Sequence, residues 1–222
     1  MPDASVPPPP SDAGDEVPPT ALMEALGGVR GVLDSAVPAT VFVLVRLATG
    51  SLNTAIVVAL ASGLVLVAVR RARGEPLQQL GSGFLGLVVA VVVARATGTG
   101  EGFFLPGIVT TGLTGVLFAV SLLARRPAVG IALAAYDAKY AGWKDHPGLR
   151  RACVLATAFW ALTFFVRAGV AAWVYSLDGD RTGLLFVVIN VVKWSLIAVA
   201  ALLTVVLVKR SGYSREVAAS ER

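Results

Sequence analysis

Six long apolar runs determine what this chain of 222 residues can fold into. They cover roughly residues 32–48, 52–69, 79–94, 104–124, 152–175 and 183–208. A helix needs about 20 predominantly apolar residues to cross the hydrocarbon core of a bilayer. The chain is also 56% hydrophobic and only 15% charged, which leaves too few polar residues to cover a soluble domain. The sequence therefore predicts an all-α, polytopic integral membrane protein with six transmembrane helices.

The two ends of the chain differ from this apolar middle. Residues 1–19 are rich in Pro and acidic residues and have almost nothing to bury, which predicts a disordered tail. They lack the basic start and apolar stretch of a signal peptide. Residues 20–210 are then the six-helix transmembrane domain, and residues 211–222 are a cytoplasmic tail. The frequent Ala, Gly, Val and Arg residues indicate a high-GC bacterium, and hence its plasma membrane.

The basic residues predict the orientation of the helices. Most of the 19 Lys and Arg residues lie before the first run, after the second and fourth runs, and after the sixth. Only Arg181 falls plainly in a connection on the other side. Because cytoplasmic loops carry the excess of basic residues, this asymmetry predicts that both termini lie in the cytoplasm, with an even number of crossings. The second and third runs are the least clearly separated, so six crossings is a preference over five.

The long connection between the fourth and fifth runs predicts an amphipathic helix in the cytoplasmic interface. Tyr136, Tyr140 and Trp143 fall on one face of a helix, with Lys139 and Lys144 beside that face. Aromatic rings at the level of the lipid headgroups, flanked by basic residues near anionic lipid, are typical of interfacial helices.

Acidic residues and the single His offer a less favoured alternative for this side of the membrane. Asp137, Asp145 and His146 lie in the same connection and could line an active site, but the stretch around His146 also reads as a turn between helices. Asp34, near the cytoplasmic end of the first run, is expected to stay at the interface.

Residues that could catalyse a reaction or hold a metal are sparse. One Cys and one His exclude a Cys/His metal cluster. Asp178 and Asp180 lack the further acids that a magnesium-diphosphate site needs. No nucleophile elbow or phosphate loop is present. We therefore expect no cofactor, metal or catalytic residue and lean against an enzyme, and topology explains the net charge of +5 better than nucleic-acid binding.

Five polar residues lie inside the apolar runs or at their outer ends. They are Arg46, Arg95, Arg167, Asn190 and Lys193. A rise of 1.5 Å per residue places the four cations at a similar level in the outer half of the bilayer, on four different helices. A charge at the bilayer centre costs roughly 2.5–3.5 kcal/mol on insertion scales, so such residues mark a candidate site.

Two interpretations of these cations stay open. Arg46 and Arg95 end their runs and can extend outward to the surface without forming any site. Arg167 and Lys193 have apolar residues on both sides, which favours a buried polar role. That role is either a pocket for an anion, such as a lipid phosphate or a carboxylate, or internal hydrogen bonding to Asn190, Tyr175 or backbone carbonyls.

Two segments of the chain resemble a known family. Residues 25–45 read ALGGVRGVLDSAVPATVFVLV, and residues 136–170 read YDAKYAGWKDHPGLRRACVLATAFWALTFFVRAGV. Both are similar to signatures of DUF3159, a family of actinobacterial integral membrane proteins, over approximately Ala25 to Arg210. No activity is established for that family, so the resemblance implies a membrane fold and no chemistry.

A looser likeness reaches the intracellular septation protein A family. It rests on RRP after the fourth run and FWALTFF in the fifth. That family is implicated in envelope integrity and division through contacts with other membrane proteins. The likeness is patchy, and it implies an envelope role by analogy only.

These observations predict a non-enzymatic plasma-membrane protein with a cell-envelope or membrane-protein interaction role. The alternative is a small transporter or lipid-anion translocator that uses the outer-half basic cluster. The expected partner is the bilayer, with anionic lipid or other membrane proteins as candidates and a homo-oligomer left open. A shared cavity for Arg95, Arg167, Asn190 and Lys193 favours the alternative, whereas separate helix faces favour a structural role.

Overall fold

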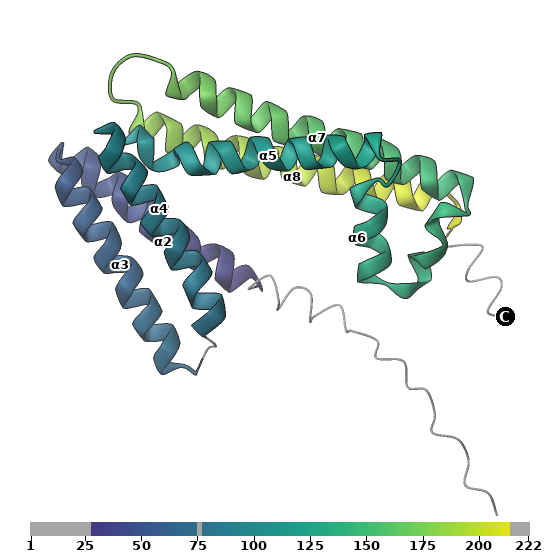
Figure 1. Ribbon diagram of the computed structural model, residues 1–222, viewed down its shortest axis with the longest axis horizontal. Helices are drawn as coiled ribbons and strands as arrows, with labels where there is room; N and C mark the ends of the chain where they lie inside the picture. The colour runs from purple at the N-terminus through teal and green to yellow at the C-terminus, as the bar shows by residue number, and fades with distance from the viewer. Residues whose placement is uncertain (1–27, 75–76, 214–222) are drawn as a thin grey trace, which may run out of the picture.

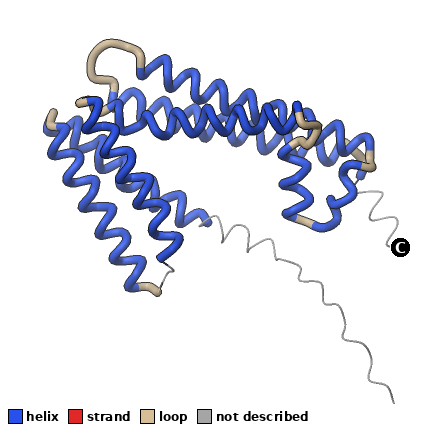
Figure 2. The backbone as a smooth tube through the Cα atoms, in the orientation of Figure 1, coloured by secondary structure: helices blue, strands red, loops and turns tan. Residues whose placement is uncertain are grey.

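The computed structural model describes residues 28–74 and 77–213, and within these ranges every regular element is a helix (Figure 1, Figure 2). The predicted all-α class is therefore confirmed. The predictions made for residues 1–19, and for all but the first residues of 211–222, lie outside the described residues.

The helices follow one another through short connections. In chain order they are α2 (Gly28–Thr49), α3 (Leu52–Ala72), α4 (Leu77–Thr97), η1 (Glu101–Phe104), α5 (Leu105–Leu123), α6 (Ala128–Tyr136), η2 (Ala138–Lys144), α7 (Pro147–Tyr175) and α8 (Thr182–Arg210). Among the described residues, four stretches are long and apolar enough to cross a membrane: α3, η1 with α5, α7 and α8. In α2 and α4 the apolar stretches found there are shorter, Ala36–Thr49 and Gly83–Thr97.

Local chemistry explains where several helices begin. Ser51 accepts the backbone N–H of Thr54 at 3.3 Å and so caps α3. His146 caps α7, because its Nδ1 accepts the backbone N–H of Leu149 at 3.1 Å and Pro147 occupies the first helical position. The single His thus has a structural role at a helix start.

The long helices form two groups of three. In one group α3 packs against α2 and α4, and in the other α7 packs against α5 and α8. The two groups meet at one end and diverge from it (Figure 1). Three connections come together at that end, which we call the rim: residues 49–51, 98–104 and 176–182.

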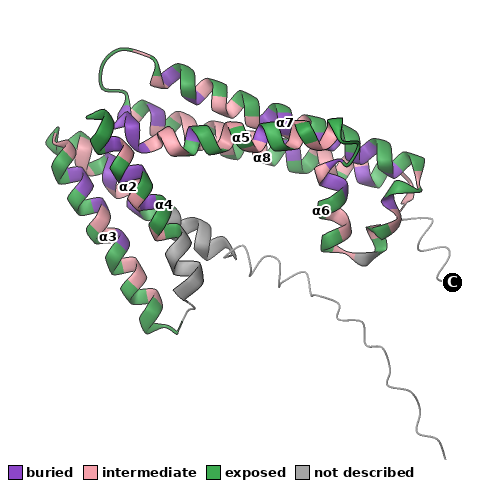
Figure 3. Cartoon of the chain, viewed as in Figure 1, coloured by how far each residue is buried: buried purple, intermediate pink, exposed green. Residues whose placement is uncertain are grey.

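Two apolar clusters hold the groups together. Phe42 of α2 and Phe103 of η1 stack with ring centroids 4.2 Å apart, in a cluster that also buries Ile56 and Leu87. A second cluster joins α5, α7 and α8 below the rim through Ile108, Ala171, Val174 and Leu185. The outward faces of the same helices remain exposed (Figure 3). Burial is therefore greatest where helices meet, while the exposed faces are largely apolar.

The prediction of one continuous amphipathic helix between α5 and α7 is wrong. The chain leaves the helical conformation at Asp137, where φ is −151° and ψ is 120°, so α6 and η2 are separate elements. The Asp137 carboxylate accepts the backbone N–H of Lys139 at 3.0 Å, which starts η2. This break ends the helical periodicity on which the prediction depended.

The aromatic residues of this segment consequently point to different surroundings. Trp143 is only 3% exposed and packs with Leu149, Cys153 and Val208. Tyr140 stacks against Tyr213, whereas Tyr136 is exposed. The aromatic face therefore serves largely to pack the segment onto the ends of α7 and α8. Asp34 lies in α2, but its side chain is outside what the structure describes.

Candidate functional site

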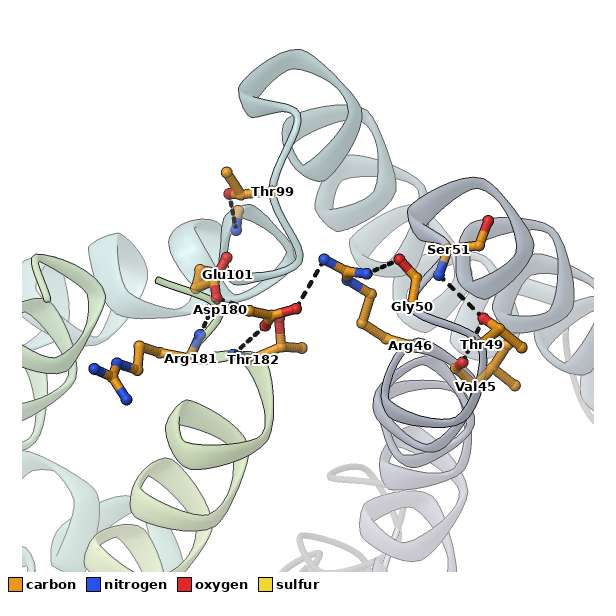
Figure 4. Close-up of polar contacts among 11 residues, drawn as sticks. Val45, Arg46, Thr49, Gly50, Ser51, Thr99, Glu101, Asp180, Arg181 and Thr182 are labelled. Carbon is orange, nitrogen blue, oxygen red and sulfur yellow. Dashed lines mark hydrogen bonds and ion pairs between the residues drawn. The ribbon is translucent and has the colours of Figure 1, made fainter. Parts of the chain in front are cut away.

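Arg46, in the last turn of α2, reaches across the rim to the connection between α7 and α8. Its Nη2 lies 2.8 Å from Oδ2 of Asp180, and its Nη1 donates to the carbonyl of Gly50 (Figure 4). The Arg46 side chain is 17% exposed. Arg46 therefore has an acidic partner at the rim, because the fold brings the Asp180 connection over the end of α2.

Glu101 is the buried acid of the rim. It is 8% exposed, and its Oε1 accepts both the backbone N–H of Arg181 and, at 3.3 Å, the hydroxyl of Thr182 (Figure 4). These donors stand at the start of α8, where backbone N–H groups lack intrahelical partners and an acidic side chain is favourable. Glu101 thus caps α8 from a distant part of the chain.

Asp180 completes this network. Its Oδ1 accepts the backbone N–H of Thr182 at 3.1 Å, while Oδ2 faces Arg46. Burial by itself raises the pKa of Asp180, but the hydrogen bonds from Thr182 and the positive charge of Arg46 outweigh it and hold that pKa below its usual value. The rim is thus a set of polar contacts that ties η1, α2 and α8 together.

Two further members of the predicted cluster have partners of their own. Arg95, exposed in the last turn of α4, donates from Nη1 to Oδ1 of Asn53 at 3.1 Å. Asn190 donates from Nδ2 to the carbonyl of Phe186, one turn earlier in α8, at 2.8 Å. Neither contact requires a ligand.

Arg167 of α7 and Lys193 of α8 are the pair that the structure brings together. They lie close enough to interact electrostatically, and both are half-buried. The guanidinium carbon of Arg167 is 5.6 Å from the centroid of the Phe164 ring, and Nζ of Lys193 is 4.9 Å from that of Trp194. Within residues 28–74 and 77–213, neither cation forms a hydrogen bond or an ion pair. The internal hydrogen bonds expected for them are therefore not made.

A family model described as a protein of unknown function, DUF3159, matches residues 26–214. This chain belongs to the DUF3159 family. The match covers both groups of helices, the rim and the Arg167–Lys193 pair. No curated protein and no solved structure matches the chain. The likeness to the septation protein A family stays a prediction.

The predicted cluster of this DUF3159 member thus divides into three parts. Arg46 and Arg95 belong to the end of the molecule that holds the rim, Asn190 is satisfied within its own helix, and Arg167 and Lys193 form a separate pair. A groove between α7 and α8 lies elsewhere along these helices and is lined by Leu155, Ala158, Phe159, Leu162, Leu203 and Leu207. It contains no polar side chain that could bind an anion.

Sequence reasoning missed the structural importance of Glu101. It stands in a turn-like stretch, TGTGEG, and nothing around it in the sequence identifies its partners, which come from residues 181 and 182. Among the described residues, no three His, Cys, Asp or Glu side chains are grouped so that they could hold a metal ion. The candidate site residues therefore form the rim network, the separate contact of Arg95 with Asn53, and one pair of cations.

Proposed function

We propose that this DUF3159 protein is a six-span plasma-membrane protein of a high-GC bacterium, with both termini in the cytoplasm, that acts by associating with other membrane proteins. The length of the first and third long helices supports six spans. α2 and α4 have 22 and 21 residues. At 1.5 Å per residue the whole helices are about 32 Å long, close to a hydrocarbon core of about 30 Å, and their apolar stretches, Ala36–Thr49 and Gly83–Thr97, occupy the part of each helix nearer the rim.

The distribution of charge supports the orientation. At the rim the acidic residues are balanced by Arg46, Arg95 and Arg181, whereas the opposite helix ends carry the excess of basic residues, namely Arg70, Arg71, Arg125, Lys209 and Arg210. Such basic ends belong on the cytoplasmic side, which makes the rim the outer end of the molecule.

The Arg167–Lys193 pair is the observation that most supports association with other membrane proteins. A protein that met only lipid tails along these helices would have no use for two half-buried cations without an anion beside them. A transport site built on all five predicted residues is less well supported, because Arg46, Arg95 and Asn190 already have partners. The envelope role rests only on the likeness to the septation protein A family.

Cysteine labelling tests the orientation. Since Cys153 is the only Cys, single Cys residues can be introduced on a Cys153→Ser background. We expect a membrane-impermeant maleimide to label Thr99→Cys and Asp178→Cys in intact cells, and Arg73→Cys and Lys144→Cys only after permeabilisation. The Cys153→Ser parent is the unlabelled control. Labelling of all four positions in intact cells, or the reverse pattern, overturns the proposed topology.

Photo-crosslinking in native membranes tests the interaction. A photoreactive residue is placed at Val166 or Val191, which are exposed near the cation pair, and at the exposed Val65 of α3 as a control. We expect discrete adducts with a membrane protein from Val166 and Val191, and lipid adducts alone from Val65. Lipid adducts alone at all three positions contradict the proposed function.

A further inference from the structure

We infer that Arg167 and Lys193 form a docking site for one acidic side chain on a transmembrane helix of a different protein. This inference deepens the proposed function and depends on it. It names the chemistry of the partner, which is an Asp or Glu placed within an otherwise apolar helix.

Arg167 and Lys193 lie at neighbouring depths on two helices that pack against each other. Arg167 is about 12 Å from the rim end of α7, and Lys193 is about 17 Å from the rim end of α8. Side chains on a helix lean toward its N-terminus. The Arg167 guanidinium accordingly lies over Phe164, one turn further from the rim. The start of α8 is at the rim, so the Lys193 side chain leans toward the rim, and the two cations interact electrostatically across the packed helices.

Within the described chain, this pair of cations has no counter-ion. Phe164 and Trp194 offer ring faces, which attract a cation without neutralising it. The two cations also repel each other, since they are like charges in an apolar setting. An anion that contacts both side chains therefore partly neutralises the two half-buried charges and also relieves the repulsion between them.

A carboxylate on a neighbouring helix reaches this pair more readily than a lipid phosphate does. α7 has 29 residues and is about 43 Å long, so about 6–7 Å of it extends beyond each side of a hydrocarbon core of about 30 Å. Arg167 is then about 5–6 Å inside the core, with its guanidinium directed still further from the headgroups. A lipid phosphate would have to leave the headgroup region to reach it, whereas a carboxylate on a neighbouring helix already lies at that level.

A second copy of this chain has no acidic side chain at the level of the pair. No Asp or Glu occurs in α3, α4, α5, α7 or α8, and the single acid of α2 is Asp34, near the end opposite the rim. Two copies in contact here would place cations against cations. Charge complementarity therefore requires a different protein.

Designed transmembrane peptides can test this inference without knowledge of the natural partner. The full-length protein is reconstituted in neutral phosphatidylcholine vesicles with a labelled Leu/Ala helix that carries a single Asp about 15 Å from one end. The same helix with Asn at that position is the matched probe. We expect energy transfer to show at least tenfold tighter association of the Asp helix, and loss of this preference in Arg167→Gln/Lys193→Gln.

Two variants control for folding and for general charge. Arg95→Gln removes an exposed cation at the end of α4, and we expect it to retain the preference for the Asp helix. Arg167→Glu/Lys193→Glu should instead prefer a helix carrying Lys, and this reversal can arise only in a folded protein.

Three results would overturn the inference. One is equal association of the Asp and Asn helices with the wild-type protein, and another is an unchanged preference in the double Gln variant. The third is competition by anionic lipid, in which phosphatidylglycerol in the vesicles displaces the Asp helix through the same two side chains and identifies lipid as the occupant. The photo-crosslinking in native membranes could still give protein adducts together with any of these results. In that case the proposed association with membrane proteins would hold, but Arg167 and Lys193 would not be the docking site.

Discussion

At the scale of single residues, Arg46 shows how the rim uses a cation that the sequence places at the end of an apolar helix. Two of its nitrogen atoms contact Asp180 and the carbonyl of Gly50, while its buried Nε has no hydrogen-bond partner in the part of the chain described. The guanidinium thus forms an ion pair with the Asp180 carboxylate, and that carboxylate in turn accepts the backbone N–H of Thr182. Asp180 therefore positions Arg46.

Replacing Asp180 by Asn should destabilise the protein by about 0.2–1 kcal/mol, the range of a partly exposed ion pair. Because the folded-state pKa of Asp180 lies below its usual value, the ionised carboxylate contributes stability above that usual value and loses the contribution as the pH falls through the folded pKa. Thermal unfolding in detergent should thus show a constant difference between wild type and Asp180→Asn from pH 8 to about 5, shrinking below about pH 4. A difference that does not depend on pH would contradict the role of the charge.

Replacing Glu101 by Ala should cost roughly 1–3 kcal/mol, because the N–H of Arg181 and the hydroxyl of Thr182 lose a buried acceptor. Glu101→Gln keeps an oxygen in place and should cost less. Unfolding in detergent measures both variants. Asp178→Ala, an exposed acid in the same part of the rim, is the control and should have little effect. Equal losses for Glu101→Ala and Asp178→Ala would contradict the capping of α8 by Glu101.

At the scale of elements, the connection between α5 and α7 shows where helical periodicity fails as a guide. Tyr136, Tyr140 and Trp143 share a face only if one helix continues through them, and the short side chain of Asp137 offers the backbone another hydrogen bond. The spacing of the aromatic residues predicts a continuous helix, but it does not include the hydrogen bond by which the Asp137 side chain competes with the helical backbone. The burial of Trp143 then follows from the new path of the chain beside α7 and α8.

Replacing Gly130 by Ala should loosen this packing, because a Cβ at Gly130 would lie only 2.9–3.0 Å from the indole ring of Trp143. The displacement should cost about 1–3 kcal/mol, as overpacking generally does. Cys153 is fully buried in the same cluster, so its rate of labelling by a small maleimide reports the change directly. We expect faster labelling in Gly130→Ala and in Trp143→Ala. Gly107→Ala, where a Cβ meets nothing, should label as slowly as wild type.

At the scale of the whole molecule, the apolar runs predicted the long helices well. The fourth and sixth runs, 104–124 and 183–208, end within a few residues of α5 and α8. The fifth run missed the first turn of α7, because that turn begins with Pro147 and His146 rather than with apolar residues. Hydrophobicity locates a helix along the chain, because a helix in contact with lipid must be apolar. Hydrophobicity does not indicate which helices are neighbours.

The same limit explains the divided cation cluster. Counting residues gives the depth of Arg46, Arg95, Arg167 and Lys193 along their helices, which is one coordinate of three. The structure supplies the other two, which give Arg46 and Arg95 different partners and bring Arg167 and Lys193 together. The pairing of Arg46 with Asp180 joins the first long helix to the last connection, a contact that no local pattern contains.

The joining of the two helix groups at the rim gives the last prediction. A Cβ at Gly183 of α8 would lie 3.3–3.8 Å from the side-chain carbons of Leu47 of α2. Two Cys residues at these positions, on a Cys153→Ser background, test the contact, because a Cys at position 47 directs its sulfur toward the place where the Leu47 side chain meets Gly183. We expect Leu47→Cys/Gly183→Cys to cross-link rapidly under mild oxidation, as seen by its altered migration without reductant. The control pair is Ala48→Cys/Gly183→Cys. The side chain at position 48 points about 100° away from that at position 47 around α2, so this pair should cross-link slowly. Equal rates for the two pairs would mean that the groups do not meet through this contact.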